Sequence, residues 1–274
     1  CTNSSYKDLA TVAGILKGRR VHWDVSFIIA PGSRQVLEML ADNGALAKLV
    51  RAGARVLESA CGPCIGMGQA PPTGDLTAHP AQDLSNHHGV VVRLHDDGRV
   101  PDDNPFVGRE GALPEIWSYG HRNPQGLAVD PATGTVWLHE HGPRGGDELN
   151  LVLRGKNYGY PIVSNGRHYS GWNIPDHDTR PEFEAPAAWW TPVISPGGLM
   201  IYKGDLFADW RGDALIPGLS SQALVRVELD GDSAREAERF EMDRRIRAAV
   251  EGPGGAVWLL EDGSGGRLLK LTPR

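Results

Sequence analysis

The chain has 274 residues, of which 40% are hydrophobic and 23% charged, a balance typical of one large or two ordinary folded domains rather than a disordered chain. Its formal net charge of −6 argues against nucleic acid as the main partner, because phosphate binding needs clustered Lys and Arg. No apolar run reaches the length of a membrane-spanning helix, so no membrane span is expected.

The composition changes near residue 80. Residues 1–80 carry 8 Lys and Arg against 6 Asp and Glu, whereas residues 81–274 carry 20 against 28. All 3 cysteines lie in the first segment, and 7 of the 8 tryptophans lie in the second. Residues 68–82 are rich in Pro and Gly without periodicity, which is typical of a linker. We therefore expect two domains, at residues 1–74 and 83–274, joined through a junction at 75–82.

The first segment alternates helix and strand signals. Residues 8–17 predict one helix, and Ser33 can cap a second stretch whose apolar residues keep helical spacing over 36–50. Continuous apolar runs at 25–30 and 54–57 have the length of strands. Apolar strands that are joined by helices indicate a parallel sheet covered on both faces, and hence an α/β fold.

The second segment changes to short strands between turns rich in Gly, Pro and Asp. The predicted strands are residues 90–94, 126–129, 136–139, 149–153, 199–202, 223–229, 257–261 and 268–271. Many short strands with frequent turns favour an all-β propeller or sandwich.

Cysteine spacing is the chemical signal of the first segment. Cys1 opens the chain, and Cys61 and Cys64 form a Cys-x-x-Cys pair far downstream. Three thiolates leave one iron of a four-iron cluster without a protein ligand, and that iron can act as a Lewis acid on a substrate oxygen. Redox and zinc sites share the Cys-x-x-Cys spacing, and buried thiols without metal are a further interpretation.

The sequence blocks around these cysteines are highly specific. The blocks are Cys1-Thr-Asn-Ser-Ser-Tyr-Lys-Asp-Leu, Ile29-Ala-Pro-Gly-Ser-Arg-Gln-Val and Ala60-Cys-Gly-Pro-Cys-Ile-Gly-Met-Gly. In order and separation they closely resemble the aconitase family over residues 1–74. The resemblance implies a partial α/β/α segment in which Cys1, Cys61 and Cys64 hold a [4Fe-4S] cluster. The family's substrate motif and its domain with the catalytic serine have no counterpart here, so citrate chemistry is not expected.

A second set of blocks runs through residues 81–274. They are Gln82-Asp-Leu-Ser-Asn, Asp102-Asp-Asn-Pro-Phe-Val-Gly, Glu115-Ile-Trp-Ser-Tyr-Gly-His-Arg-Asn-Pro-Gln-Gly, Glu140-His-Gly-Pro-Arg-Gly-Gly-Asp-Glu, Gly155-Lys-Asn-Tyr-Gly-Tyr-Pro, Trp210-Arg-Gly-Asp-Ala-Leu and Arg245-Ile-Arg. Together they resemble the pyrroloquinoline quinone (PQQ)-dependent aldose sugar dehydrogenases, the soluble glucose/sorbosone dehydrogenase family. The resemblance implies an all-β, partial six-bladed β-propeller with three or four of the six blades.

The same resemblance implies a cofactor site. Its cofactor-binding residues would be Arg122, Asn123, His141, Asp147, Arg245 and Arg247, and the backbone carbonyls of Gly142 and Pro143 would bind calcium. The chemistry agrees, because the quinone carries three carboxylates that guanidinium groups bind well, and calcium prefers oxygen ligands. Calcium would polarise the quinone, which accepts a hydride from the anomeric carbon of the sugar.

Three departures from the family bear on activity. The histidine that serves as the family's catalytic base belongs to earlier blades, so the catalytic residue of this chain is unknown. Ser220 and Ser221 stand where the family often has a lysine, and Ala248 follows the Arg-x-Arg motif in place of an aspartate. We therefore expect PQQ-dependent oxidation of aldose sugars that is impaired by truncation.

Two alternatives stay open at this point: an iron–sulfur hydro-lyase of the aconitase type, and a non-catalytic truncated fusion or assembly artefact. The expected partner is a small-molecule sugar, and the strand edges of an unclosed propeller predict self-association. The compartment stays open as well, since the propeller family is periplasmic or secreted and the sequence shows no signal peptide.

Overall fold

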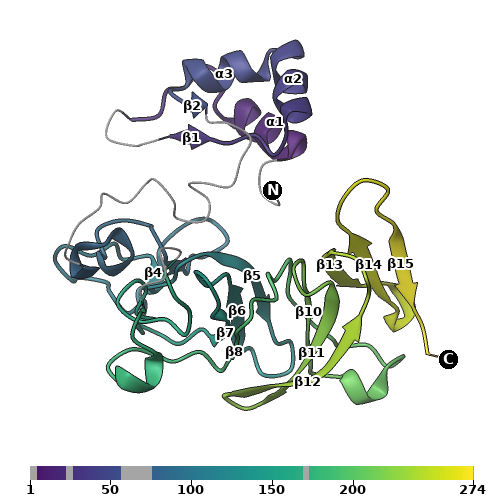
Figure 1. Cartoon of the computed structure of the whole chain (residues 1–274). Helices are drawn as coiled ribbons and strands as arrows, with labels where there is room; N and C mark the ends of the chain where they lie inside the picture. Colours follow the sequence, from purple (N-terminus) through teal and green to yellow (C-terminus); the bar gives the residue numbers. More distant parts are fainter. Residues whose placement is uncertain (1–4, 23–26, 57–75, 169–172, 274) are drawn as a thin grey trace. The chain divides into compact units, whose positions relative to one another are not determined.

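The computed structural model describes residues 5–22, 27–56, 76–168 and 173–273. The chain divides into two compact units, residues 1–67 and 68–274, each with its own core (Figure 1). None of the helices in this described part combines the length and the apolar character that crossing a bilayer requires.

The first unit pairs two short parallel strands with three helices. The elements are α1 (Tyr6–Ile15), β1 (Ile28–Ile29), α2 (Arg34–Asp42), α3 (Ala45–Arg51) and β2 (Arg55–Val56), and β1 pairs with β2 in parallel. The predicted cap is confirmed, because Ser33 Oγ accepts the Val36 amide at 3.1 Å. The stretch predicted as one helix is two, since Gly44 adopts a left-handed conformation (φ 73°) and starts α3.

A small apolar core joins these elements. It contains Leu9 of α1, Ile29 of β1, Leu40 of α2 and Leu49 of α3, all of them buried. The parallel pairing predicted from the apolar runs is therefore present, with helices packed on it.

The second unit consists of antiparallel sheets that follow one another along the chain. The first pairs β3 (Val91–Val92) with β4 (Ile116–Ser118), and the second has the order β5 (Pro124–Val129), β6 (Val136–Glu140), β7 (Asp147–Leu151) and β8 (Ala188–Trp190). The third joins β9 (Met200–Ile201), β10 (Ala214–Pro217), β11 (Ala223–Asp230) and β12 (Ser233–Glu241), and the fourth joins β13 (Ile246–Glu251), β14 (Val257–Glu261) and β15 (Leu268–Leu271). Short 3₁₀ helices punctuate the loops: η2 (Leu76–Ala78), η3 (Pro80–Gln82), η4 (His177–Thr179), η5 (Ala208–Trp210) and η6 (Pro253–Gly255).

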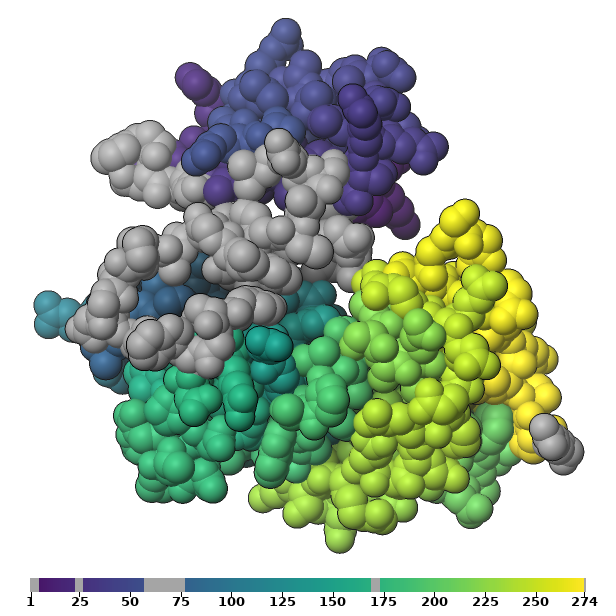
Figure 2. Space-filling view, viewed as in Figure 1, coloured from purple at the N-terminus to yellow at the C-terminus, as the bar shows by residue number. Residues whose placement is uncertain are grey.

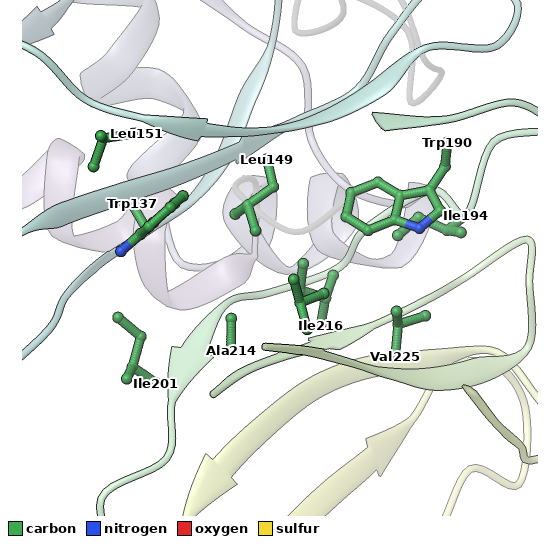
Figure 3. Packing of buried hydrophobic residues seen from close by; sticks show 10 residues of the cluster. Trp137, Leu149, Leu151, Trp190, Ile194, Ile201, Ala214, Ile216 and Val225 are labelled. Carbon is green, nitrogen blue, oxygen red and sulfur yellow. The ribbon is translucent and has the colours of Figure 1, made fainter. Parts of the chain in front are cut away.

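Neighbouring sheets pack face to face. Trp137 and Leu149 of the second sheet point toward Ala214 and Ile216 of the third, and all four are buried (Figure 3). A separate cluster, which includes Leu215 and Leu259, joins the third sheet to the fourth. Each strand of the third sheet thus alternates between two cores, as the two-residue repeat of a β-strand requires. The second unit is mostly β, and its second, third and fourth sheets are stacked in chain order.

Candidate cofactor site

The two long sequence motifs meet at one buried carboxylate, that of Glu140 at the end of β6. Its Oε2 accepts the backbone N–H groups of Arg122 (2.6 Å) and Asn123 (2.9 Å). Its Oε1 accepts Asn150 Nδ2 at 3.0 Å and is hydrogen-bonded to His121 Nδ1 at 3.1 Å. Only 2% of Glu140 is exposed. Glu140 therefore fixes the turn that leads into β5, and with it the start of the arginine-containing motif.

The surroundings of Glu140 keep it charged. Burial acts to raise the pKa of Glu140, but the hydrogen bond from His121 and those from the two backbone amides hold it below its ordinary value. His121 stacks on Tyr158 with 4.3 Å between ring centroids, and its Nε2 is hydrogen-bonded to Ser118 Oγ at 2.9 Å. Both ring nitrogens of His121 are thus engaged within the fold, which makes this histidine structural.

Arg122 and His141 form the next layer of the site. Arg122 Nη1 donates to the His141 carbonyl at 2.9 Å, and His141 Nε2 is hydrogen-bonded to the Pro196 carbonyl at 3.1 Å. Burial, followed by the charges of Arg122 and Arg247, lowers the pKa of His141. The Arg247 backbone lies beside the same loop, since a Cβ on Gly197, the residue after Pro196, would lie 2.6 Å from the Arg247 carbonyl oxygen. Arg122, in the loop before β5, and the backbone of Arg247 in β13 are therefore both placed next to the contact between His141 and Pro196.

Asp147 closes the loop that follows β6. Its Oδ1 accepts the Gly142 amide at 2.9 Å, and its Oδ2 accepts the Ser195 amide at 2.6 Å. Burial raises the pKa of Asp147 to about 6, although those amides and the charge of Arg122 act in the opposite direction. Gly142 has no room for a side chain, since a Cβ there would lie 2.1 Å from the Gly146 carbonyl oxygen. The loop is therefore folded tightly back on itself.

The carbonyl oxygens of Gly142 and Pro143 suit a hard cation. Among the hydrogen bonds between described residues, none ends on either of these oxygens. The same part of the chain contains no group of three or more His, Cys, Asp or Glu side chains arranged for a metal. A calcium ion at this loop would therefore be bound by backbone carbonyl oxygens and by oxygens of the cofactor that it accompanies.

Arg245 and Arg247 share a carboxylate that the sequence prediction missed. Asp262, which follows β14, binds Arg245 Nε through Oδ2 at 2.7 Å and Arg247 Nη2 through Oδ1 at 3.1 Å. The Asp262 amide also donates to the Arg245 carbonyl at 2.8 Å. Ala248 follows the Arg-x-Arg motif where the family has an aspartate, so the arginine pair has no carboxylate next to it in the sequence. This is the one sequence signal that could have prompted a search for Asp262.

Asn123 carries an unsatisfied donor. Its side chain is buried and its Oδ1 accepts Gln125 Nε2 at 2.8 Å, whereas its Nδ2 has no hydrogen-bond partner among the described residues. A buried amide without an acceptor is costly, and a carboxylate or carbonyl of a ligand would satisfy it. With the arginines and the loop carbonyls, this donor set fits a polyanionic cofactor accompanied by a cation. Gln125 is a second residue of the site that the sequence prediction missed.

Glu148 is a third residue that the prediction missed. Burial, reinforced by the charge of Glu140, raises the pKa of Glu148 well above its ordinary value. Its Oε2 accepts Asn150 Nδ2 at 3.3 Å, so one amide lies between the two buried carboxyl groups. A small cavity of about 10 Å³ is lined by both carboxyl groups together with Tyr158.

The structure thus links most of the predicted cofactor residues. Hydrogen bonds join Arg122, Asn123 and His141, and the next residue, Gly142, is bonded to Asp147. Arg247 is ion-paired with Asp262, and its backbone lies beside Gly197. Arg245 shares Asp262 and is half-exposed. The predicted cluster ligands Cys1, Cys61 and Cys64 fall outside the described residues.

Comparison with known proteins gives two matches on one chain. Residues 65–270 match the family model described as Glucose / Sorbosone dehydrogenase, and residues 1–86 match that of the Aconitase family (aconitate hydratase). The two matched ranges overlap at the junction that the composition indicates.

Individual relatives likewise belong either to the sugar dehydrogenases or to the aconitase family. An aldose sugar dehydrogenase of Escherichia coli K12 is 43% identical over 198 residues, which are 71% of this chain and 53% of the relative. The PQQ-bound aldose sugar dehydrogenase of Streptomyces coelicolor is 30% identical, with a TM-score of 0.54, over 73% of this chain and 55% of that one. A probable methanogen homoaconitase large subunit of Methanothermobacter thermautotrophicus is 44% identical over 66 residues, which are 24% of this chain and 15% of that protein. The chain spans about half the length of the curated sugar dehydrogenases that it matches.

Proposed function

Because residues 65–270 make this chain a member of the glucose/sorbosone dehydrogenase family, we propose that its second unit binds PQQ together with calcium and serves the oxidation of aldose sugars. The observation that carries the proposal is the buried Asn123 Nδ2, which has no partner among the described residues, beside Arg122, whose Nη1 donates to the His141 carbonyl at 2.9 Å. When bound, the quinone supplies the hydride acceptor for the anomeric carbon.

The residues of this chain would hold the cofactor. Arg122 and Arg247 would pair with its carboxylates, and Asn123 Nδ2 would donate to a cofactor oxygen, a partner that none of the described residues supplies. The Gly142 and Pro143 carbonyls would bind calcium, held in position by the Asp147 hydrogen bond to the Gly142 amide. His141, whose pKa is lowered by burial and by the two arginines, would face the cofactor as a neutral imidazole.

The stacked sheets support the same assignment at the level of fold. We infer that the sheets of residues 83–274 are successive blades of a partial six-bladed propeller, since the second sheet packs on the third and the third on the fourth in chain order. Residues 1–74 would form an aconitase-like α/β/α fragment, with the junction at 75–82.

A binding titration tests the cofactor proposal. We expect the full chain to bind PQQ in the presence of calcium, with affinity lost on addition of EGTA and reduced roughly 100-fold in the Arg247→Ala variant. Arg154→Ala, which removes an exposed arginine outside the site, serves as the control and should bind as the parent chain does. Binding that is absent, or equal in the two variants, would reject the proposal.

Turnover is a separate question from binding. No described residue is assigned as the base that removes the sugar hydroxyl proton, so we expect dye-linked aldose oxidation by this chain to be absent or very slow. Robust oxidation would show that a base is present after all.

A second candidate function concerns the first unit. The match of residues 1–86 to the aconitase family favours a [4Fe-4S] cluster on Cys1, Cys61 and Cys64. Anaerobic reconstitution of the full chain should yield bound iron and sulfide that are lost in air, and the Cys61→Ala variant should retain less. Hydration of aconitate is not expected. If neither the quinone nor iron binds, the chain is a non-catalytic fusion.

A further inference from the structure

Strand β5 carries a β-bulge close to its start. Pro124 pairs with Glu140 and Gly126 pairs with His139, so two steps along β5 oppose one step along β6, and Gln125 is the extra residue. The residue after the bulge has no room for a side chain, because a Cβ on Gly126 would lie 2.3 Å from His139 Nε2. Strand β5 belongs to the teal part of the second unit, which in Figure 2 adjoins the green part that contains β9. A bulge of this kind changes the direction of one side chain, here that of Gln125.

The Gln125 side chain holds the amide of Asn123 by one end. Gln125 Nε2 donates to Asn123 Oδ1 at 2.8 Å, while Asn123 Nδ2 is buried and has no partner among the described residues. An asparagine amide has an acceptor end and a donor end, and half a turn of its terminal torsion exchanges them. Because the donor of Gln125 occupies the acceptor end, the donor end of Asn123 is turned away from Gln125. The hydrogen bond therefore selects one of the two orientations of this amide.

A second Gln–Asn pair of the same unit shows what a self-satisfied arrangement looks like. Asn157 Nδ2 donates to Gln82 Oε1 at 2.7 Å, and Gln82 Nε2 donates back to Asn157 Oδ1 at 3.2 Å. That pair satisfies its own donors and acceptors, as a purely structural contact should. The pair of Gln125 and Asn123 is one-sided and leaves a buried donor, which is costly unless a ligand accepts it.

The backbone places this one-sided amide at the candidate cofactor site. The Asn123 carbonyl accepts the His141 amide at 3.1 Å, and the next residue of that loop is Gly142. We propose that Gln125 is a positioning residue, which acts through Asn123 by keeping the donor end of its amide toward the cofactor. This inference rests on the proposed binding of PQQ, whose carboxylates are acceptors. With the amide reversed, Asn123 Oδ1 would meet those acceptors with its own lone pairs.

A cycle of variants of the full chain tests the inference through calcium-dependent PQQ binding, measured by isothermal titration. Gln125→Glu puts an acceptor against Asn123 Oδ1, so the amide should reverse and the dissociation constant should rise roughly tenfold. In the Asn123→Ala background there is no amide to reverse, and the same change should alter the constant by less than about twofold. Gln35→Glu adds the same charge at an exposed position of α2 and should bind as the parent chain does.

The cycle separates orientation of the amide from a direct effect of charge. A new carboxylate that repelled the cofactor itself would weaken binding equally in both backgrounds, and that result would overturn the proposal. Gln125→Ala removes the donor without adding charge. It should weaken binding by a smaller factor than Gln125→Glu, and again only where Asn123 is present.

Spectra of the cofactor-free chain keep this inference distinct from the proposed function. In ¹H–¹⁵N correlation spectra, the Nδ2 protons of Asn123 should move downfield in Gln125→Glu, because they then donate to a carboxylate. Backbone resonances that stay in place would show that the fold is intact. A parent chain that binds no PQQ would reject the proposed function, while the spectra still report which way the amide points. Asn123 resonances that do not move would overturn the role of Gln125 even if PQQ binds.

Discussion

Glu140 accepts the backbone amide of Arg122 at 2.6 Å, and this one hydrogen bond ties together two motifs that lie on neighbouring strands. The same oxygen accepts the Asn123 amide, and the other oxygen accepts the Asn150 side chain. A buried, charged acceptor with several donors stabilises a fold only while every donor stays paired. The position of Arg122 at the proposed cofactor site therefore depends on the buried Glu140 carboxylate.

Replacing Glu140 with Gln should destabilise the second unit. The amide group would point a donor at groups that are themselves donors, so we expect the free energy of unfolding to fall by about 3 kcal/mol. Urea unfolding followed by tryptophan fluorescence measures this, because most tryptophans lie in the second segment. Glu182→Gln, which removes an exposed ion pair with Arg180, should cost less than about 1 kcal/mol. Equal losses in the two variants would contradict the role given to Glu140.

Asp147 should make stability depend on pH in mildly acidic solution. Burial raises the pKa of Asp147 to about 6 from an ordinary value of 3.8, so the folded chain holds this proton more tightly than the unfolded chain does. The resulting stabilisation is complete below pH 3.8, declines as the pH rises, and is lost above about pH 6. Between pH 4 and 7 it amounts to roughly 3 kcal/mol.

The Asp147→Asn variant should lack this pH-dependent contribution to the free energy of unfolding. Unfolding free energies in EGTA at several pH values should therefore show a difference between parent and variant that changes across pH 4–6 and is constant above pH 7. Asp178→Asn, at an exposed position, provides the matched control. Parallel curves for the parent chain and Asp147→Asn would refute the assignment.

Asp262 should matter to cofactor affinity without contacting the cofactor. It holds Arg245 and Arg247 through separate oxygens, and an asparagine would lose the charge that orders both guanidinium groups. We expect Asp262→Asn to weaken calcium-dependent PQQ binding roughly tenfold, as is typical when a group that orients a ligand is removed. Isothermal titration measures this, with Asp205→Asn, which removes an exposed partner of Arg211, as the control. Unchanged affinity would mean that Asp262 merely neutralises charge at the surface.

Sequence patterns predicted several of the strands whose apolar residues stand out, although the apolar strand β10 (Ala214–Pro217) was missed. Strand β14 (Val257–Glu261) and strand β15 (Leu268–Leu271) lie where they were expected, because Val, Leu and Trp crowd there between turn residues. Strand β12 (Ser233–Glu241) was missed, since five of its nine residues are Arg or Glu. It forms at the edge of a sheet, where Arg239 pairs with Glu236 and Glu236 accepts the Trp190 indole N–H at 2.6 Å. Partners that are remote in sequence, rather than local pattern, determine such a strand.

The residues of the candidate site also divide into those that local sequence patterns predict and those whose role depends on partners remote in sequence. The blocks around Arg122 and Gly142 could be recognised because their residues are contiguous in the sequence. Asp262 could not, because it joins the arginines only through the pairing of β13 with β14. Glu140 stands in a recognised block, but its role depends on the turn before β5 returning to it, which spacing does not reveal.

Leu149 offers a test of whether the two units unfold independently. It is fully buried between the second and third sheets, so Leu149→Ala removes its contacts and leaves a cavity, which typically costs 2–5 kcal/mol, and we expect about 3 kcal/mol. Trp137 and Trp190 line the same cluster and report its loss by fluorescence.

The α-helices of the described residues all lie in the first unit, so the helical dichroism signal at 222 nm reports that unit instead. Because the two cores share no residue, the fluorescence transition should move to lower urea while the helical transition stays in place. Val107→Ala, at a position 44% exposed, should move neither by more than about 0.5 kcal/mol. If both transitions shift together in Leu149→Ala, the chain unfolds as one cooperative body and its units are not separate domains.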